Sequence, residues 1–151
     1  MGLRERLTDE IKDAMRARDA ARLSALRLMS GAIKDREIAL RGEGGAPSEA
    51  DELAVLAKMV KQRQESARLY LEGKRLDLAE KEQAEIAVIE EFLPKPLTPA
   101  EVDAAIAAAV AESGAASIKD MGRVMAMLKG QYTGRMDFGA VGALIKAKLS
   151  A

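Results

Sequence analysis

The sequence contains no cysteine, no histidine and no tryptophan among its 151 residues. Without cysteine the chain cannot form a disulfide, a thiolate zinc site, an iron–sulfur cluster or a cysteine nucleophile. Without histidine it lacks the commonest general base and metal ligand, and the side chain that titrates near neutral pH. These absences remove most familiar catalytic centres, and we expect neither a metal nor another cofactor.

Aromatic side chains are also scarce, at 3% of residues against 48% hydrophobic residues in all, so alanine and aliphatic side chains must supply the core. The 24 basic and 24 acidic residues balance, and the net charge therefore favours no class of partner. Residues 1–4 do not open an apolar signal segment, and no stretch approaches the roughly 18 apolar residues of a membrane-spanning helix. We expect a soluble, cytoplasmic protein with no membrane partner.

Hydrophobic periodicity predicts an all-α fold, because apolar residues recur at spacings of three and four and nowhere alternate as in a strand. Residues 1–93 are predicted to form a four-helix N-terminal domain. A glycine-rich break at 42–47 separates the second helix, which runs to about Leu40, from the third. Ser48 is the predicted N-cap of the third helix and Gly73 its end. The apolar positions that define the core-facing stripes include Met15 and Leu71.

Three prolines in residues 94–99 predict an extended linker, since proline is excluded from helix interiors. Residues 100–151 are then a small tail domain of three helices. Thr98 is the predicted N-cap of its first helix, with Pro99 at the first helical position and Glu101 completing a capping box. Further boundaries are predicted at Gly114 (end of that helix), Ser117 with Asp120 (start of the next, which runs to about Gly130) and Asp137 (cap of the last).

No assembled catalytic site is recognisable, and we predict no catalytic residue. Acidic residues crowd the helix at 76–93, but di-metal helical bundles pair glutamate with histidine, so a solvated acidic face is the interpretation. The glycine-rich segment 42–47 lacks the Gly-Lys-Ser/Thr ending of a phosphate loop. Ser30 and Lys34 lie one helical turn apart, but serine–lysine chemistry needs an activated pair, and Ser30 is expected on the packed side of its helix.

Charge is segregated along the chain, which favours polyanion binding by its basic parts. Residues 1–76 hold 16 basic and 13 acidic groups, residues 77–112 hold two and nine, and residues 113–151 hold six and two. Because aromatic residues that could stack on bases are few, any contact with nucleic acid should be to backbone and shape. The predicted RNA-binding residues are Arg123, Lys129, Arg135, Lys146 and Lys148 in the tail, and Lys58, Lys61, Arg63 and Arg68 in the third helix.

Several segments resemble one known family. Residues 121–129, followed by Gly134, Asp137, Val141 and Leu149, resemble the GatB/YqeY tail, the module that ends the B subunit of glutamine-dependent aspartyl/glutamyl-tRNA amidotransferases. Residues 61–66, 75–82 and 92–97 resemble free-standing YqeY proteins, and the resemblance extends over essentially the whole chain. It implies a helical N-terminal part joined to a three-helix tail.

The resemblance also implies a function. In the amidotransferase the tail contacts tRNA, while the catalytic core and the glutaminase, both absent here, perform the reaction. This chain is therefore expected to be a non-catalytic module that binds tRNA or other structured RNA and could dock onto amidotransferase or translation machinery. Two alternatives stay open: an accessory to tRNA-dependent amidation, consistent with a carbon–nitrogen ligase label that uses glutamine as amido-N-donor, and a protein-interaction helical bundle.

Overall fold

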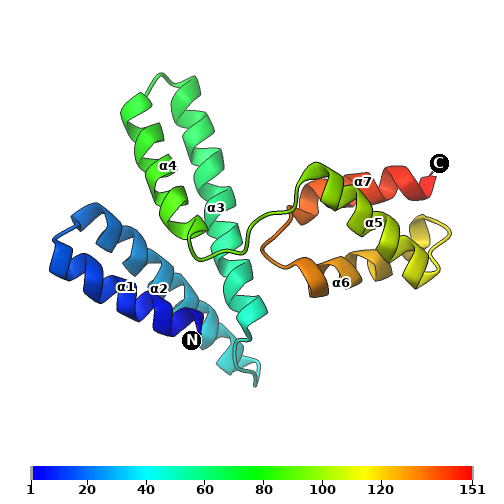
Figure 1. Ribbon diagram of the computed structural model, residues 1–151, viewed down its shortest axis with the longest axis horizontal. Coiled ribbons are helices and arrows are strands. Elements are labelled where there is room, and N and C mark those ends of the chain that lie inside the picture. The colour runs from blue at the N-terminus through cyan, green and yellow to red at the C-terminus, as the bar shows by residue number, and fades with distance from the viewer. Residues whose placement is uncertain (1, 151) are drawn as a thin grey trace. The chain divides into compact units, whose positions relative to one another are not determined.

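The computed structural model describes residues 2–150, and within that range the fold is all-helical, without strands, which confirms the predicted fold class. None of the helices in these residues is both long and apolar enough to cross a membrane. Figure 1 shows the elements, which are α1 (Leu3–Ala17), α2 (Ala20–Gly42), α3 (Glu49–Glu72), α4 (Leu76–Glu90), α5 (Pro99–Ser113), the short 3-10 helix η1 (Ile118–Asp120), α6 (Met121–Tyr132) and α7 (Phe138–Ser150).

The chain divides into two compact units, residues 1–94 and residues 95–151. In the first unit α3 and α4 form a helical hairpin, joined by a short turn, and α1 and α2 pair beside each other (Figure 1). The most deeply buried side chains of this unit come from α2, α3 and α4 and are Leu26, Met29, Leu56 and Ile89. Leu3 and Leu7 of α1 join the same cluster, which makes one continuous core.

The second unit has a separate core between α5, α6 and α7. Val124 and Leu128 of α6 and Ile145 of α7 are fully buried there, with Ile106 of α5 almost so. α6 and α7 pack closely at Gly142, where an added Cβ would be in van der Waals contact with the methyl group of Met125, 3.4 Å away. Methionine side chains thus fill the space that scarce aromatic residues leave, a use to which their flexibility suits them.

The predicted helix ends are mostly confirmed. Ser48 and Thr98 each form a capping box, with the side chains of Asp51 and Glu101 respectively. Gly114, with φ of 70°, ends α5 in the left-handed conformation that glycine favours. α3 ends before Gly73 as predicted, but the left-handed residue there is Lys74, with φ of 59°.

Two predicted core residues are wrong, and three helix ends differ from the predicted positions. Met15 and Leu71 are 53% and 47% exposed, and on α1 the adjacent Ala14 is buried instead of Met15. Met59 is buried in α3 instead. α2 extends to Gly42 and α6 to Tyr132, about two residues beyond the predicted ends, and α4 ends at Glu90, three residues before the predicted end at 93.

Candidate nucleic-acid interface

The nine cations predicted to bind RNA lie in both units. The arginines and the lysines among them differ in the contacts that they make within the chain. Each of the four arginines contacts another group of the same unit. Lys58, Lys129, Lys146 and Lys148 are exposed, and within residues 2–150 none of these four lysines forms an ion pair. Lys61 is exposed as well, on α3. Lys58, Lys129, Lys146 and Lys148 are therefore available to a partner without the loss of an ion pair within the described residues.

Arg63 holds the α3–α4 hairpin together. Its Nε lies 3.0 Å from Oε2 of Glu85 on α4, and its Nη1 donates to the Met59 carbonyl oxygen at 3.3 Å. Only 16% of the Arg63 side chain and 17% of the Glu85 side chain are exposed. An ion pair this sheltered neutralises the guanidinium, so Arg63 acts within the fold rather than on the predicted surface.

Arg68 and Arg123 are exposed but paired along their own helices. Arg68 bridges Glu65 and Glu72 on α3, and hydrogen bonding to its guanidinium lowers the pKa of Glu65. Arg123 pairs with Asp120 at the start of α6. Because such surface pairs contribute little, typically about 0.2–1 kcal/mol, they can open when a stronger anion approaches.

Arg135 lies in the connection between α6 and α7 and is half-buried. Its Nε donates to the Lys95 carbonyl oxygen at 3.0 Å, and its own carbonyl oxygen accepts the Leu97 N–H at 2.8 Å. The guanidinium carbon lies 6.0 Å from the centroid of the Tyr132 ring. The side chain thus fastens the start of the second unit to the α6–α7 connection.

The two carboxylates of residues 113–151 are both occupied as helix caps. Asp120 accepts the Ala116 N–H at 2.9 Å, and this bond, together with Arg123, lowers the pKa of its carboxyl group. Asp137 accepts the Gly139 N–H at 2.9 Å, which confirms its predicted capping of α7. Backbone N–H groups therefore engage the acidic charge of this segment, while the lysines face solvent.

Helical spacing shows which lysines share a face. Lys58 and Lys61 are three residues apart, which makes them neighbours on one side of α3. Lys146 and Lys148 are two residues apart, about 200° around α7, and so project from opposite flanks. The predicted set also omits Lys119, an exposed residue of η1. A full count of the six basic residues in the tail would have included it.

Ser30, the serine considered for serine–lysine chemistry, is exposed and does not lie on the packed side of α2 as expected. Lys34 is exposed too, and a lysine in water lacks the desolvation that would make it an activating base. In the part of the chain that the structure describes, no group of three or more acidic residues is placed to hold a metal ion.

Comparison with known proteins adds a family and three relatives. The model of the family described as Yqey-like protein matches residues 4–149. "Altered inheritance of mitochondria protein 41, mitochondrial" of Saccharomyces cerevisiae is 36% identical over 100 residues, which cover 64% of this chain and 51% of that protein. Proteins of the same name from Clavispora lusitaniae and Candida glabrata are 39% and 35% identical, over 56% and 63% of this chain and 47% and 52% of their own lengths.

The chain spans about half the length of the curated relatives it matches. These relatives are named as mitochondrial proteins, and that finding overturns the expected cytoplasmic location. The absence of a targeting segment at residues 1–4, on which the expectation rested, describes only the start of this sequence and says nothing about the compartment of its relatives.

Proposed function

Because the chain belongs to the Yqey-like protein family, we propose that it is a non-catalytic module that binds tRNA or similarly folded RNA through the second unit. The likeness of this unit to the tRNA-contacting tail of the amidotransferase B subunit supports the proposal. The setting we propose is that of the relatives, whose names place them in mitochondria.

One observation carries the proposal. Lys129, Lys146 and Lys148 present exposed ammonium groups on α6 and α7, while the two carboxylates of residues 113–151 cap helices. Residues 113–151 hold six basic and two acidic groups, a net charge of +4. Exposed cations in such excess bind polyanions by neutralising phosphates and releasing counterions.

The chemistry of contact follows from the side chains available. Tyr132 and Phe138 are partly buried against the core of the second unit, so neither offers an open ring on which a base could stack. Lysine is a compact point charge that binds phosphate without the paired geometry of a guanidinium. The surface is therefore suited to the phosphate backbone and shape of a folded RNA rather than to its sequence.

The experiment compares two triple variants with the same change in net charge. The test variant replaces Lys129, Lys146 and Lys148 by Glu, and the matched control replaces the exposed Lys12, Lys74 and Lys81 by Glu. Affinity for bulk tRNA is measured by fluorescence anisotropy, and fold by far-UV circular dichroism. We expect the test variant to lose at least about tenfold in affinity, since each lost phosphate contact weakens binding, and the control to lose far less.

Two results would contradict the proposal. Equal losses in both variants would mean that only the total charge of the chain matters. Affinity that survives the tail variant but falls in a Lys58→Glu, Lys61→Glu double variant would move the RNA surface to α3 of the first unit.

A further inference from the structure

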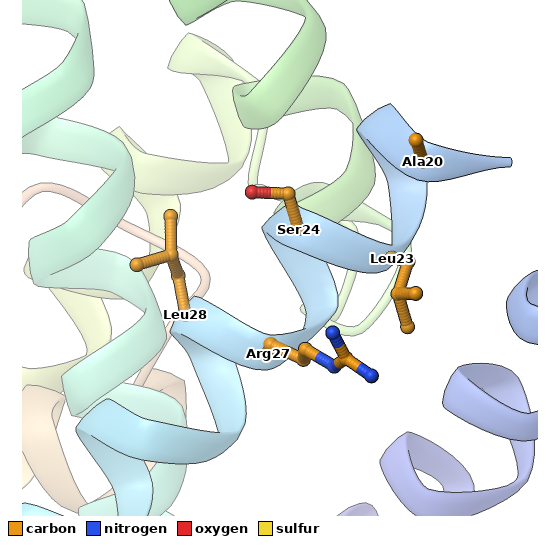
Figure 2. A pocket seen from close by; sticks show the side chains of 5 residues that line it. All are labelled: Ala20, Leu23, Ser24, Arg27 and Leu28. Atoms are coloured by element: carbon orange, nitrogen blue, oxygen red, sulfur yellow. The ribbon is translucent and has the colours of Figure 1, made fainter.

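The outer side of α2 carries an exposed, partly apolar face. An open groove of about 410 Å³ lies along its first turns, lined by Ala20, Leu23, Ser24, Arg27 and Leu28. Figure 2 shows Ser24 and Leu28 toward one edge of this helix face and Leu23 and Arg27 toward the other edge. The lining residues recur at i, i+3, i+4, i+7 and i+8, the spacing of a helix face that usually packs against a neighbour. Leu28 is nevertheless 48% exposed.

The exposed face continues along α2 beyond the groove. Ile38, which is 55% exposed, lies on the same side, opposite the buried Leu26, Met29 and Ile33. Residues that share this side fall within about 100° of one another around the helix axis. We refer to them as the α2 face, which consists of Ala20, Ser24, Arg27, Leu28, Gly31, Asp35 and Ile38, all of them exposed.

Charge on the α2 face is arranged symmetrically about Gly31. Arg27 lies four residues before Gly31 and Asp35 four residues after it. In the described part of the chain neither Arg27 nor Asp35 has an ion-pair partner, unlike Arg22, Arg63 and Arg68. Because the unpaired cation and the unpaired anion lie at equal distances from Gly31, the α2 face is complementary in charge to an antiparallel copy of itself.

Gly31 supplies the close approach that such a pairing requires. A Cβ added there would meet nothing within 4 Å, so the fold of the single chain does not need glycine at this position. Glycine inside a helix is unfavourable relative to alanine, but it allows another backbone to approach closely. A glycine at the centre of an exposed, self-complementary face marks the point where a second helix can cross.

We propose that the α2 face is a self-association surface on which α2 of a second copy packs antiparallel, with a twofold axis at Gly31. Each Arg27 then pairs with the partner's Asp35, which gives two equivalent ion pairs, as an isologous interface demands. A parallel arrangement would instead set Arg27 against the partner's Arg27. The charges therefore select both the partner and its direction.

The interface consists of one helix from each copy, which is small beside the roughly 1,600 Å² buried in a standard stable complex. The dimer should accordingly be weak and dependent on concentration. Leu28 and Ile38 provide the apolar part of the contact, and the two ion pairs fix its register. Self-association through the first unit is independent of RNA binding by the second unit, so either can fail without the other.

Sedimentation velocity on the full chain over a concentration series provides the test. Arg27→Asp and Asp35→Arg should each weaken the dimer at least about tenfold, since each sets like charges against one another twice. The double variant with both substitutions should restore association, because the two charges have exchanged places. Lys12→Asp, which makes the same change in charge as Arg27→Asp but at an exposed lysine of α1, should leave the dimer unchanged. A chain that stays monomeric, or a double variant that fails to recover, overturns the proposal.

A covalent test uses the absence of cysteine in the chain. Gly31→Cys should form an intermolecular disulfide under mild oxidation, because the twofold axis brings the two thiols together. Gly122→Cys is the control, since Gly122 is also exposed and open but lies on α6. Equal crosslinking at both positions would reflect random collision and would contradict a specific contact at Gly31.

Discussion

Arg135 Nε and the Lys95 carbonyl oxygen lie 3.0 Å apart, although the two residues are separated by forty positions in the sequence. The Leu97 N–H, which donates to the carbonyl oxygen of Arg135, strengthens the same junction. This junction closes the second unit by joining its first residues to the α6–α7 connection. Arg135 was predicted to contact RNA, and its geometry gives it a structural role within the second unit.

A pair of substitutions at Arg135 separates the two roles. Arg135→Gln removes the charge and keeps a side-chain donor for the Lys95 carbonyl, whereas Arg135→Lys keeps the charge and loses the planar guanidinium. If the role is structural, Arg135→Lys should lower the free energy of unfolding by about 1 kcal/mol, and Arg135→Gln should leave tRNA affinity unchanged. Urea denaturation and fluorescence anisotropy measure the two quantities. A large loss of tRNA affinity in Arg135→Gln alone would assign Arg135 to the RNA surface.

The two units have separate hydrophobic cores, so damage to one core should stay within its own unit. Leu26→Ala and Leu128→Ala each remove a fully buried side chain, at a cost of about 2–5 kcal/mol. Hydrogen exchange should accelerate across residues 3–90 in the first variant and across residues 99–150 in the second. Acceleration of both units in either variant would show that they unfold together.

Glu52, in the first turn of α3, should make stability depend on pH. Its Oε2 is buried and, among the described residues, has no hydrogen-bond partner. Burial raises the pKa of Glu52 above its ordinary 4.5. The positive charge of Arg4 on α1 lowers this pKa, and the negative charges of Glu49, Glu37 and Asp51 raise it. The folded state therefore holds this proton more tightly than the unfolded state does.

The sign of the effect follows from that difference. Below pH 4.5 Glu52 is protonated in both states. As the pH rises, Glu52 ionises first in the unfolded state, so the free energy of unfolding falls until the pH has passed the pKa of Glu52 in the folded state. Glu52→Gln removes this component. The variant should match the parent protein in acid and exceed its free energy of unfolding near neutral pH, as measured by urea titrations at several pH values. A glutamine variant less stable than the parent near neutral pH would contradict this account.

Sequence reasoning predicted the features that depend on neighbours along the chain. The capping boxes at Ser48 and Thr98 were predictable because the residues that form them lie three positions apart. The ion pair between Arg63 and Glu85 was not, since it depends on how two helices align across a turn. The same limit explains why four arginines were counted as available cations although each has a contact within its own unit.

The exact edge of a buried helix face was harder to predict than the existence of the helix. Periodicity assigns both Ala14 and Met15 to the core-facing side of α1, but only Ala14 is buried, because the direction of the packing helices decides which of two adjacent apolar residues faces the core. At the end of α3 the predicted terminating residue, Gly73, is confirmed, but the left-handed residue is the following Lys74. Glycine permits a left-handed conformation without requiring it, so the exact turning residue depends on the loop that follows.

The central claim is that Lys129, Lys146 and Lys148 contact the phosphates of tRNA. The most direct test is the salt dependence of tRNA affinity, measured for the parent protein and for the Lys129→Glu, Lys146→Glu, Lys148→Glu variant. On a log–log plot each neutralised phosphate contributes about 0.7–0.9 to the slope. If these lysines are the phosphate contacts, the magnitude of the slope should fall by about 2–3 in the variant. Parallel lines of equal slope for the two proteins would show that the three lysines do not touch the RNA, and would contradict the account.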